Sequence, residues 1–184
     1  MSILTYSDLV GLVVSGVVTG VRPDQINGAS IDLTLGNILW TEASPNGLGT
    51  VVDLIQKDTP TMDQVDLGKV GYYDLKPGQF VLAATREVFH LPRDVAAEYK
   101  LKSSMARAGL GHLLAGWADP GWHGSVLTLE FTNHLRYHSL RLRPGMRCGQ
   151  MIFYRGKEVP DHASYAVRGR YNGDTAATPS KGVR

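Results

Sequence analysis

The sequence has a single cysteine, Cys148, among its 184 residues. One cysteine excludes a disulfide within the chain and any zinc cluster built from several cysteine ligands. The six histidines show no spacing typical of metal ligands, so we expect no metal site formed by the protein itself. A chain without disulfides is typical of a reducing compartment, and we expect the cytoplasm, or the host cytoplasm if the protein is viral.

Long apolar runs are also absent. No stretch approaches the roughly eighteen apolar residues that indicate a membrane-spanning helix. The N-terminal residues show no basic segment followed by an apolar one, which is the pattern of a secretion signal. We therefore expect neither membrane association nor secretion.

Positive and negative side chains nearly balance, with 19 Lys and Arg against 17 Asp and Glu. The formal net charge is +2, which is too low to indicate a nucleic-acid binder on electrostatic grounds. The cations are nevertheless concentrated in the last third of the chain, which suits either an anionic ligand or an ordinary solvated surface. These cations are Arg136, Arg141, Arg143, Arg147, Arg155, Lys157, Arg168, Arg170, Lys181 and Arg184.

The amino-acid composition is typical of one mainly β domain. Hydrophobic residues make up 43% of the chain, which is enough for a core. The 21 glycines and 9 prolines separate short apolar runs, and this favours strands and turns over long helices. One helix is predicted, over residues 7–16, because a hydroxyl cap and Asp8 open it and Gly16 ends it.

Period-two alternation predicts most of the strands. Residues 29–35 form a predicted strand that ends at Gly36, and a second strand is expected from residue 37. Residues 42–71 are polar and irregular, and we expect one or two weak strands there. The other predicted strands cover residues 80–85, 87–91, 97–101, 126–132 and 150–154.

Two copies of an apolar-basic-Pro-Gly segment precede predicted strands, at residues 75–78 and 142–145. Proline presets the first turn torsion and glycine accepts the positive one, so both segments predict type II turns.

Residues 164–184 contain glycine, small residues and scattered cations around Tyr165 and Tyr171. This composition cannot form a core of its own. We therefore expect a single domain over residues 1–163, followed by a flexible tail that closes over a site or stays disordered.

Residues 102–130 combine polar groups that are poor material for a core. Two adjacent hydroxyls, two cations, an aspartate in a Gly/Pro turn and a glutamate on a predicted strand fall within this stretch. In that strand Leu129 and Phe131 share one face, so Thr128 and Glu130 lie on the other. Such groups suit a site for a charged, polar small molecule, whereas a lone strand glutamate is more often a solvated surface charge.

Four motifs, in this order, resemble the dCTP deaminase family: KSSMARAGL, AGWADPGW, LTLEFTN and GQMIF. The resemblance runs nearly end to end, since SIDLTL, LKPGQFVLAAT, FHLPRD and RYNGDTAATPSK also fit the family. It implies the fold shared with trimeric dUTP diphosphatases: a mainly β, distorted barrel or jelly-roll-like domain with a short N-terminal helix. It also implies a homotrimer with an active site at each subunit interface.

The resemblance further implies which residues meet the substrate, a deoxynucleoside triphosphate. His112 stands where the family commonly has a histidine, and we expect it to pack or bond within the core. The implied site residues are Lys102, Ser103, Ser104 and Arg107 for the triphosphate and the catalytic centre, Asp119 and Trp122 for the sugar, Thr128 and Glu130 for the base, Gln150 for the substrate, and Tyr165, Arg170 and Asp174 from the tail.

The chemistry implied is a deamination without zinc. Zinc deaminases require His-x-Glu and Pro-Cys-x-x-Cys motifs, and neither is present here. Glu130 would instead take a proton from a water held also by Ser103 and the carbonyl of Ala115. Arg107 would orient Glu130 and stabilise the developing negative charge. The expected cofactor is Mg²⁺, held mainly by the triphosphate of dCTP or a close analogue.

The spacing of two site residues departs from the family pattern. Asp119 and Glu130 are one residue further apart than in the family. In a strand, one extra residue turns every following side chain to the other face unless a bulge absorbs it. We therefore predict a bulge or a longer turn near residues 123–125.

The identity of two other residues also departs from the pattern. Asp174 stands where the family usually has glutamine, and Leu114 where a threonine is common. Because an ionised aspartate only accepts hydrogen bonds, the site is expected to favour a base edge with an extra donor, unless the tail aligns differently.

The first product expected is dUTP, and three alternatives remain open. The segment Ala115-Gly116-Trp117 resembles the variant motif of bifunctional members, which also cleave the triphosphate and give dUMP. A dUTP diphosphatase of the same fold is disfavoured, because Trp122 stands where that enzyme has the tyrosine of an Asp-x-Asp-Tyr motif. The third alternative is a nucleotide-binding regulator that has lost the chemistry.

Overall fold

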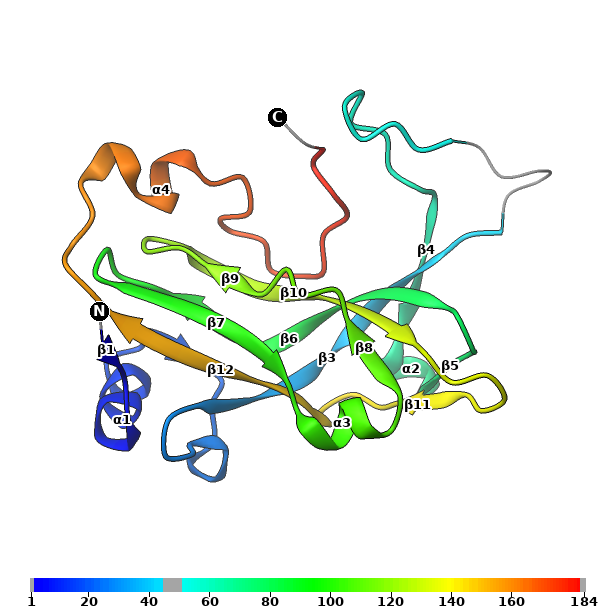
Figure 1. Cartoon of the computed structure of the whole chain (residues 1–184), viewed down its shortest axis with the longest axis horizontal. Helices are drawn as coiled ribbons and strands as arrows, with labels where there is room; N and C mark the ends of the chain where they lie inside the picture. The colour runs from blue at the N-terminus through cyan, green and yellow to red at the C-terminus, as the bar shows by residue number, and fades with distance from the viewer. Residues whose placement is uncertain (1, 45–50, 183–184) are drawn as a thin grey trace.

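Most strands of the chain belong to one curled antiparallel sheet in the computed structural model, which describes residues 2–44 and 51–182 (Figure 1). The strands are β1 (Ser2–Ile3), β2 (Val18–Thr19), β3 (Ile31–Glu42), β4 (Met62–Asp66), β5 (Tyr73–Leu75), β6 (Phe80–His90), β7 (Val95–Leu101), β8 (Leu110–His112), β9 (Trp117–Ala118), β10 (His123–Asn133), β11 (Leu140–Leu142) and β12 (Arg147–Arg155). The sheet order is β8-β10-β6-β3-β12-β7-β9, with β1 on β12, β2 on β6 and β4 on β3. The prediction of a mainly β, barrel-like fold is confirmed.

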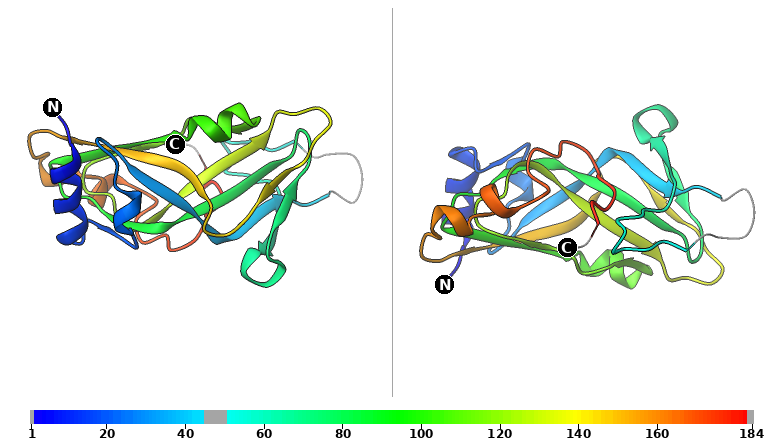
Figure 2. Two further views of the ribbon diagram at one scale, coloured as in Figure 1. Left: turned by 90° about the horizontal axis from the view of Figure 1, so that it is seen from below. Right: turned by 90° about the horizontal axis from the view of Figure 1, so that it is seen from above.

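The helices are short and lie outside the sheet. They are α1 (Tyr6–Val14), α2 (Leu67–Val70), α3 (Ser103–Arg107) and α4 (Tyr165–Arg168), with 3-10 turns at Pro23–Gln25 and Asp161–Ala163. The predicted N-terminal helix is confirmed as α1, where the backbone N–H of Thr5 donates to Asp8 Oδ2 at 3.1 Å. It lies at one end of an elongated body (Figure 2). The other three helices were not predicted, because a single turn carries no periodicity to read.

The prediction that a strand ends at Gly36 is wrong, because β3 continues through it to Glu42. A Cβ atom at Gly36 would lie 3.0 Å from the carbonyl oxygen of Ala84 on β6. The glycine therefore marks a close approach of two strands, and not a strand end. The register between β3 and β6 also shifts in this region, between Leu35 and Leu39.

The two Pro-Gly turns are confirmed, with φ of +74° at Gly78 and +78° at Gly145. The strands that lead into them, β5 and β11, pair with each other in a separate two-stranded sheet. The repeated sequence segment thus corresponds to two turns at opposite ends of this small antiparallel sheet, each of which delivers the chain into a long strand of the main sheet.

The predicted bulge lies in β10. Its register against β6 shifts between His123 and Ser125, and again between Val126 and Thr128. Gly124, between the first pair, has a φ of +65°, which glycine adopts at little cost. After these shifts the expected alternation holds, because Leu129 and Phe131 are buried while Glu130 is only partly so.

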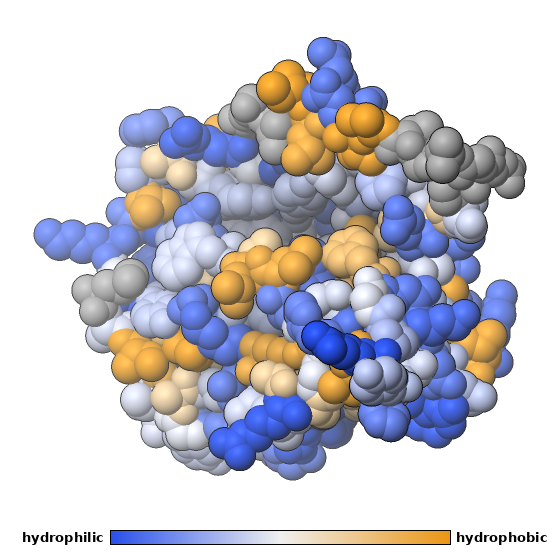
Figure 3. Space-filling model, turned by 45° about the vertical axis from the view of Figure 1, so that its right-hand side comes forward, coloured by the Kyte–Doolittle hydropathy of each residue, from blue (hydrophilic) through white to orange (hydrophobic). Residues whose placement is uncertain are grey.

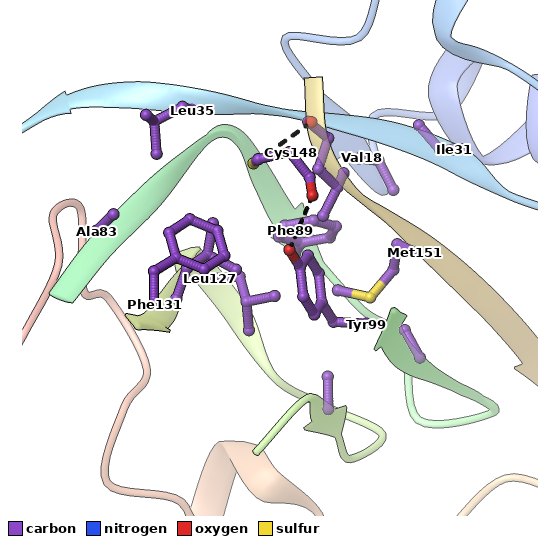
Figure 4. Close-up of a cluster of buried hydrophobic side chains, with 14 of the residues drawn as sticks. Val18, Ile31, Leu35, Ala83, Phe89, Tyr99, Leu127, Phe131, Cys148 and Met151 are labelled. Atoms are coloured by element: carbon purple, nitrogen blue, oxygen red, sulfur yellow. Dashed lines mark hydrogen bonds between the residues drawn. The ribbon is translucent and has the colours of Figure 1, made fainter. Parts of the chain in front are cut away.

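The core lies in the concave side of the curl, where aromatic and aliphatic side chains interdigitate (Figure 4). Tyr99 donates its hydroxyl to the carbonyl of Cys148 at 3.3 Å, and Cys148 Sγ donates to the carbonyl of Leu33 at 3.7 Å. Burial, followed by the nearby charge of Glu87, raises the pKa of the Cys148 thiol to about 12. The only cysteine is therefore a packing residue.

A fully buried carboxylate ties the N-terminal third of the chain to β6. Glu87 has no exposed surface, and its oxygens accept from Gln25 Nε2 at 2.8 Å, from the Thr34 backbone N–H at 2.9 Å and from Thr34 Oγ1 at 2.7 Å. Charge-assisted hydrogen bonds of this kind compensate for the loss of water around a buried charge.

Exposed apolar side chains stand among polar ones on the face seen in Figure 3 and do not form one continuous patch. None of the helices in the described ranges is long and apolar enough to span a membrane.

Candidate functional site

A cavity opens between β10, β9 and the C-terminal tail. Its volume of about 560 Å³ is typical of small-molecule sites. Its lining is mainly apolar, with a few polar groups that can orient a ligand. The lining residues are Thr59, Pro60, Met62, Phe80, Leu82, Ala115, Trp117, Ala118, Trp122, Val126, Leu127, Thr128, Glu130, Tyr165, Tyr171, Asp174, Thr178, Pro179 and Ser180.

Glu130 reaches this cavity because of the alternation of β10. Its neighbours Leu129 and Phe131 point into the core, and its partner across the β10–β6 pair is Leu82, which also lines the cavity. The Glu130 side chain is 22% exposed. A carboxylate held among apolar groups, with limited access to water, is suited to accepting a proton from a bound water molecule.

The tail forms one wall of the cavity and runs beside the bulged start of β10 (Figure 1). The backbone N–H of Val126 donates to the carbonyl of Asp174 at 2.9 Å, and that of Gly173 donates to the carbonyl of His123 at 3.2 Å. β8 pairs with β10 only from Phe131 to Asn133, so these backbone groups of β10 lie beyond the end of β8. The tail therefore continues the sheet locally, as a short extra strand would.

Side chains of the body add further bonds to the tail. The backbone N–H of Thr178 donates to Thr128 Oγ1 at 3.3 Å, and Trp40 Nε1 donates to the carbonyl of Ala177 at 3.1 Å. Ala177 itself is 4% exposed and packs on Leu82 and neighbouring residues. The tail is thus attached to the body by packing as well as by hydrogen bonds.

An ion pair between Lys181 and Asp174 links two parts of the tail beside the cavity. Lys181 Nζ donates to both carboxylate oxygens of Asp174 at 3.0 Å and to the carbonyl of Arg170 at 2.7 Å. Arg170 Nη1 donates in return to the carbonyl of Lys181 at 3.1 Å, and the ammonium lies 4.8 Å from the ring centroid of Tyr171. Asp174 is predicted to close the site from the tail. Its negative charge is balanced by Lys181 within the tail itself.

Aromatic residues form the inner end of the cavity. Trp122 is 5% exposed, stacks on Phe89 with ring centroids 5.2 Å apart, and donates Nε1 to the carbonyl of Tyr171 at 3.0 Å. Burial raises the pKa of Tyr165, so its phenol is protonated at neutral pH and can donate a hydrogen bond. The predicted sugar residue Asp119 is exposed and accepts from Trp117 Nε1 at 2.8 Å.

The structure brings only part of the predicted site together within one chain. Ala115, Trp122, Thr128, Glu130, Tyr165 and Asp174 line the cavity, whereas Lys102, Ser103, Ser104, Arg107, Asp119, Gln150 and Arg170 do not. Ser103, Ser104 and Arg107 are exposed on and beside α3. Lys102 Nζ donates to Asp32 Oδ1 at 2.7 Å, and Asp32 is 1% exposed.

Sequence reasoning missed one whole wall of the cavity. Thr59 and Pro60 come from the irregular segment that precedes β4, Met62 is the first residue of β4, and Phe80 and Leu82 come from β6. The segment at residues 59–62 carried no periodic or motif signal. The alternation of β6 could have placed Phe80 and Leu82 on the same face as each other, but not beside Glu130, because that neighbourhood depends on the β6–β10 register.

Within residues 2–44 and 51–182 the structure contains no cluster of three or more His, Cys, Asp or Glu side chains that could hold a metal ion. The carboxylates that line the cavity are Glu130 and Asp174.

Comparisons with known proteins identify the family to which the chain belongs. A profile of the dCTP deaminase-like family matches residues 3–156. The "dCTP deaminase, dUMP-forming" of Acidothermus cellulolyticus is 40% identical over 131 residues, which cover 66% of this chain and 68% of that protein. The protein of the same name from Methanoregula boonei is 35% identical over 161 residues, which cover 86% of this chain and 84% of that protein.

A solved structure has the same fold. The crystal structure of 2'-deoxycytidine 5'-triphosphate deaminase from Agrobacterium tumefaciens superposes with a TM-score of 0.65 at 24% identity, over 84% of this chain. The match spans 48% of the length of that chain, and at this identity it supports the fold alone. On the strength of the family profile and the curated relatives, the chain belongs to the dCTP deaminase-like family.

Proposed function

We propose that this protein deaminates dCTP and then cleaves the triphosphate, releasing ammonia, dUMP and diphosphate. The sequence predicts dUTP as the product, with dUMP as the alternative. The names of the relatives, "dCTP deaminase, dUMP-forming", favour the alternative. The single observation that carries the proposal is the half-buried Glu130 on a bulged strand, facing a cavity of nucleotide size.

The first step is hydrolysis at C4 of cytosine. Glu130 takes a proton from a water molecule, and the resulting hydroxide adds to C4. Glu130 then passes the proton to N3, so the tetrahedral intermediate carries no net charge on the ring. Glu130 next takes the proton of the new C4 hydroxyl and delivers it to the exocyclic amine, so C4=O forms as the C4–N4 bond breaks and ammonia leaves with the bonding electron pair. Ala115, which lines the same cavity, offers its carbonyl to hold the attacking water.

The second step is hydrolysis at phosphorus. A second water attacks the α-phosphorus, the bond from that phosphorus to the α,β-bridging oxygen breaks, and diphosphate leaves. Mg²⁺ would enter with the substrate, held mainly by the triphosphate, and would offset the negative charge of the phosphates during the attack. Lys102, Ser104 and Arg170 supply donors to the phosphates.

The catalytic centre is completed by a neighbouring subunit of a homotrimer. In one chain, Ser103 and Arg107 are exposed near α3 and do not reach the cavity that contains Glu130. A site between subunits accounts for this separation, because α3 of one subunit then faces the cavity of the next. Ser103 holds the attacking water there, and Arg107 orients Glu130 and stabilises developing charge.

The remaining groups of the site recognise the sugar and the base. Trp122 lies under the deoxyribose, Asp119 accepts from its 3′-hydroxyl, and Thr128 bonds the base edge, with Gln150 as a further substrate contact. The tail, residues 164–184, follows the domain formed by residues 1–163 and acts as a cover for the bound nucleotide. Its attachment to β10 at Val126 and Thr128 supports this arrangement. The pool of free nucleotides places the reaction in the cytoplasm.

One incubation tests the proposal. The purified protein is mixed with each deoxynucleoside triphosphate and Mg²⁺, and the products are separated and identified by mass. Ammonia, dUMP and diphosphate from dCTP are expected. Release of dUTP without diphosphate supports deamination alone, and cleavage of dUTP without any ammonia from dCTP supports a dUTP diphosphatase instead.

A further inference from the structure

A buried histidine stands directly behind Glu130. His112 ends β8, whose register pairs it with Phe131, the neighbour of Glu130 on β10. Its imidazole is 3% exposed and lies between two aromatic rings, with centroids 4.5 Å from Tyr99 and 6.0 Å from Phe131. The ring is therefore confined on both sides and has little freedom to turn.

A backbone bond determines which nitrogen of this ring carries the proton. The N–H of Leu114 donates to His112 Nδ1 at 3.1 Å. A nitrogen that accepts a hydrogen bond has its lone pair exposed, so in the neutral ring the proton is on Nε2. Leu114 makes this bond from a left-handed conformation, with φ of +63°, which a leucine rarely adopts. The fold thus maintains an unfavourable backbone conformation at the point that fixes the tautomer.

The protonated nitrogen faces the carboxylate of Glu130. His112 Nε2 lies 3.2 Å from Glu130 Oε2, and neither atom has a hydrogen-bond partner elsewhere in the described part of the chain. The pair is within ion-pair distance but is not aligned as a hydrogen bond in the free protein. Catalytic hydrogen bonds are often misaligned before substrate binds and tighten when it does.

We propose that His112 is a positioning residue for Glu130. When nucleotide fills the cavity, Nε2–H donates to Oε2 and holds one carboxylate oxygen, so that the other oxygen is presented to the attacking water. The donor comes from a neutral ring, so Glu130 remains free to take up and release a proton. This inference rests on the proposed function in one respect, namely that Glu130 is the general base.

Substitutions at His112 separate the donor role from a packing role. Glutamine places an N–H donor near the position of Nε2, asparagine places one only near Nδ1, and phenylalanine keeps the ring packing without any donor. We expect H112N and H112F to lower kcat for ammonia release by about 10–100-fold, as is typical for groups that orient a reactive residue. We expect H112Q to recover at least about a third of the wild-type kcat, with KM for dCTP changed less than about threefold in all three variants.

Two results would overturn the inference. One is a kcat for H112F within about twofold of wild type, and the other is a kcat for H112Q as low as that of H112N. A loss of ammonia release by the wild-type protein itself would instead contradict the proposed function, so the two failures are distinguishable. Urea unfolding of each variant shows whether a lost kcat reflects a lost fold.

A measurement on the unmodified protein covers the case in which the variants do not fold. The ¹⁵N spectrum of the His112 imidazole distinguishes its tautomers directly. We expect the Nε2–H form, and we expect its proton resonance to move downfield when a non-hydrolysable dCTP analogue binds. An Nδ1–H tautomer, or an Nε2 proton that is unaffected by the analogue, would overturn the inference.

Discussion

Two carboxylates on the paired strands β6 and β10 differ in their hydrogen-bond partners. This difference distinguishes a structural role from a chemical one. Glu87 is fully buried and accepts hydrogen bonds from Gln25 and Thr34, so its oxygens are engaged within the fold. Glu130 is partly exposed, and its Oε2 accepts from no group in the described residues. A carboxylate whose oxygens are both engaged stabilises the folded state, whereas a partly exposed one without such partners can exchange protons with a ligand.

Glu130→Gln should abolish ammonia release while leaving nucleotide binding measurable. An amide cannot accept a proton from water at neutral pH, but it occupies the same volume and still forms hydrogen bonds with a base. We expect kcat to fall at least about 10³-fold and the Kd for dCTP, from calorimetry, to change less than about tenfold. The control is Glu98→Gln, a partly exposed glutamate on β7 that bonds Lys100 and Tyr154. Normal turnover by Glu130→Gln would remove Glu130 from the mechanism.

Cys148 should make the folded state less stable at alkaline pH. Burial raises the pKa of its thiol from 9.0 to about 12, so the unfolded chain loses this proton at a lower pH than the folded one. A raised pKa gives stability that is complete below pH 9 and is lost as pH rises toward 12. Between pH 8 and pH 10 we expect the free energy of unfolding to fall by about 1 kcal/mol more in the wild type than in Cys148→Ala, as measured in urea. Equal losses in the two proteins would show that the thiol does not contribute.

At the scale of elements, the tail depends on a single ammonium group for much of its local order. Lys181 bonds both oxygens of Asp174 and the carbonyl of Arg170, while Gly173 and Asp174 pair with β10. The first set of bonds shapes the tail and the second attaches it to the sheet. Glutamine in place of Asp174 could not form this ion pair.

Lys181→Met should loosen the tail without unfolding the domain. Methionine keeps the aliphatic stem but removes all three donors. We expect faster amide hydrogen exchange over residues 170–181, a KM for dCTP raised about 3–30-fold, and an unchanged urea midpoint. Lys157→Met, at an exposed position outside the cavity, is the matched control. Unchanged exchange in the tail would mean that the bonds to β10 suffice to order it.

How far the sequence predicted these elements depended on the range of the interactions involved. The alternation of β10 and the two Pro-Gly turns are local patterns and were predicted from them, whereas the bulge near Gly124 was predicted from the spacing of Asp119 and Glu130 relative to the family. Gly36 was read as a strand end because the reason for it, the close approach of Ala84, is distant in sequence. The cavity wall at residues 59–62 was missed for the same reason. Motifs identified Glu130, but only the sheet register showed what surrounds it.

At the scale of the whole molecule, the structure holds the predicted site residues in two separate sets. The cavity with Glu130 lies between the sheet and the tail, whereas Ser103 and Arg107 are exposed by α3. In the homotrimer that we propose, each α3 would meet a neighbour's cavity, and every site would be completed at once.

Mixed trimers should therefore recover activity that neither parent has. Arg107→Ala and Glu130→Gln are each expected to be inactive, but a trimer that contains both has interfaces where an intact Arg107 from one subunit meets an intact Glu130 from the next. Random assembly makes about one interface in four intact, so co-expressed and co-purified variants should show up to about a quarter of the wild-type ammonia release. A mixture of the separately purified variants should remain inactive if it is kept under conditions that prevent subunit exchange. If the co-assembled protein is no more active than its parents, Arg107 and Glu130 act within the same subunit, and the shared site is wrong.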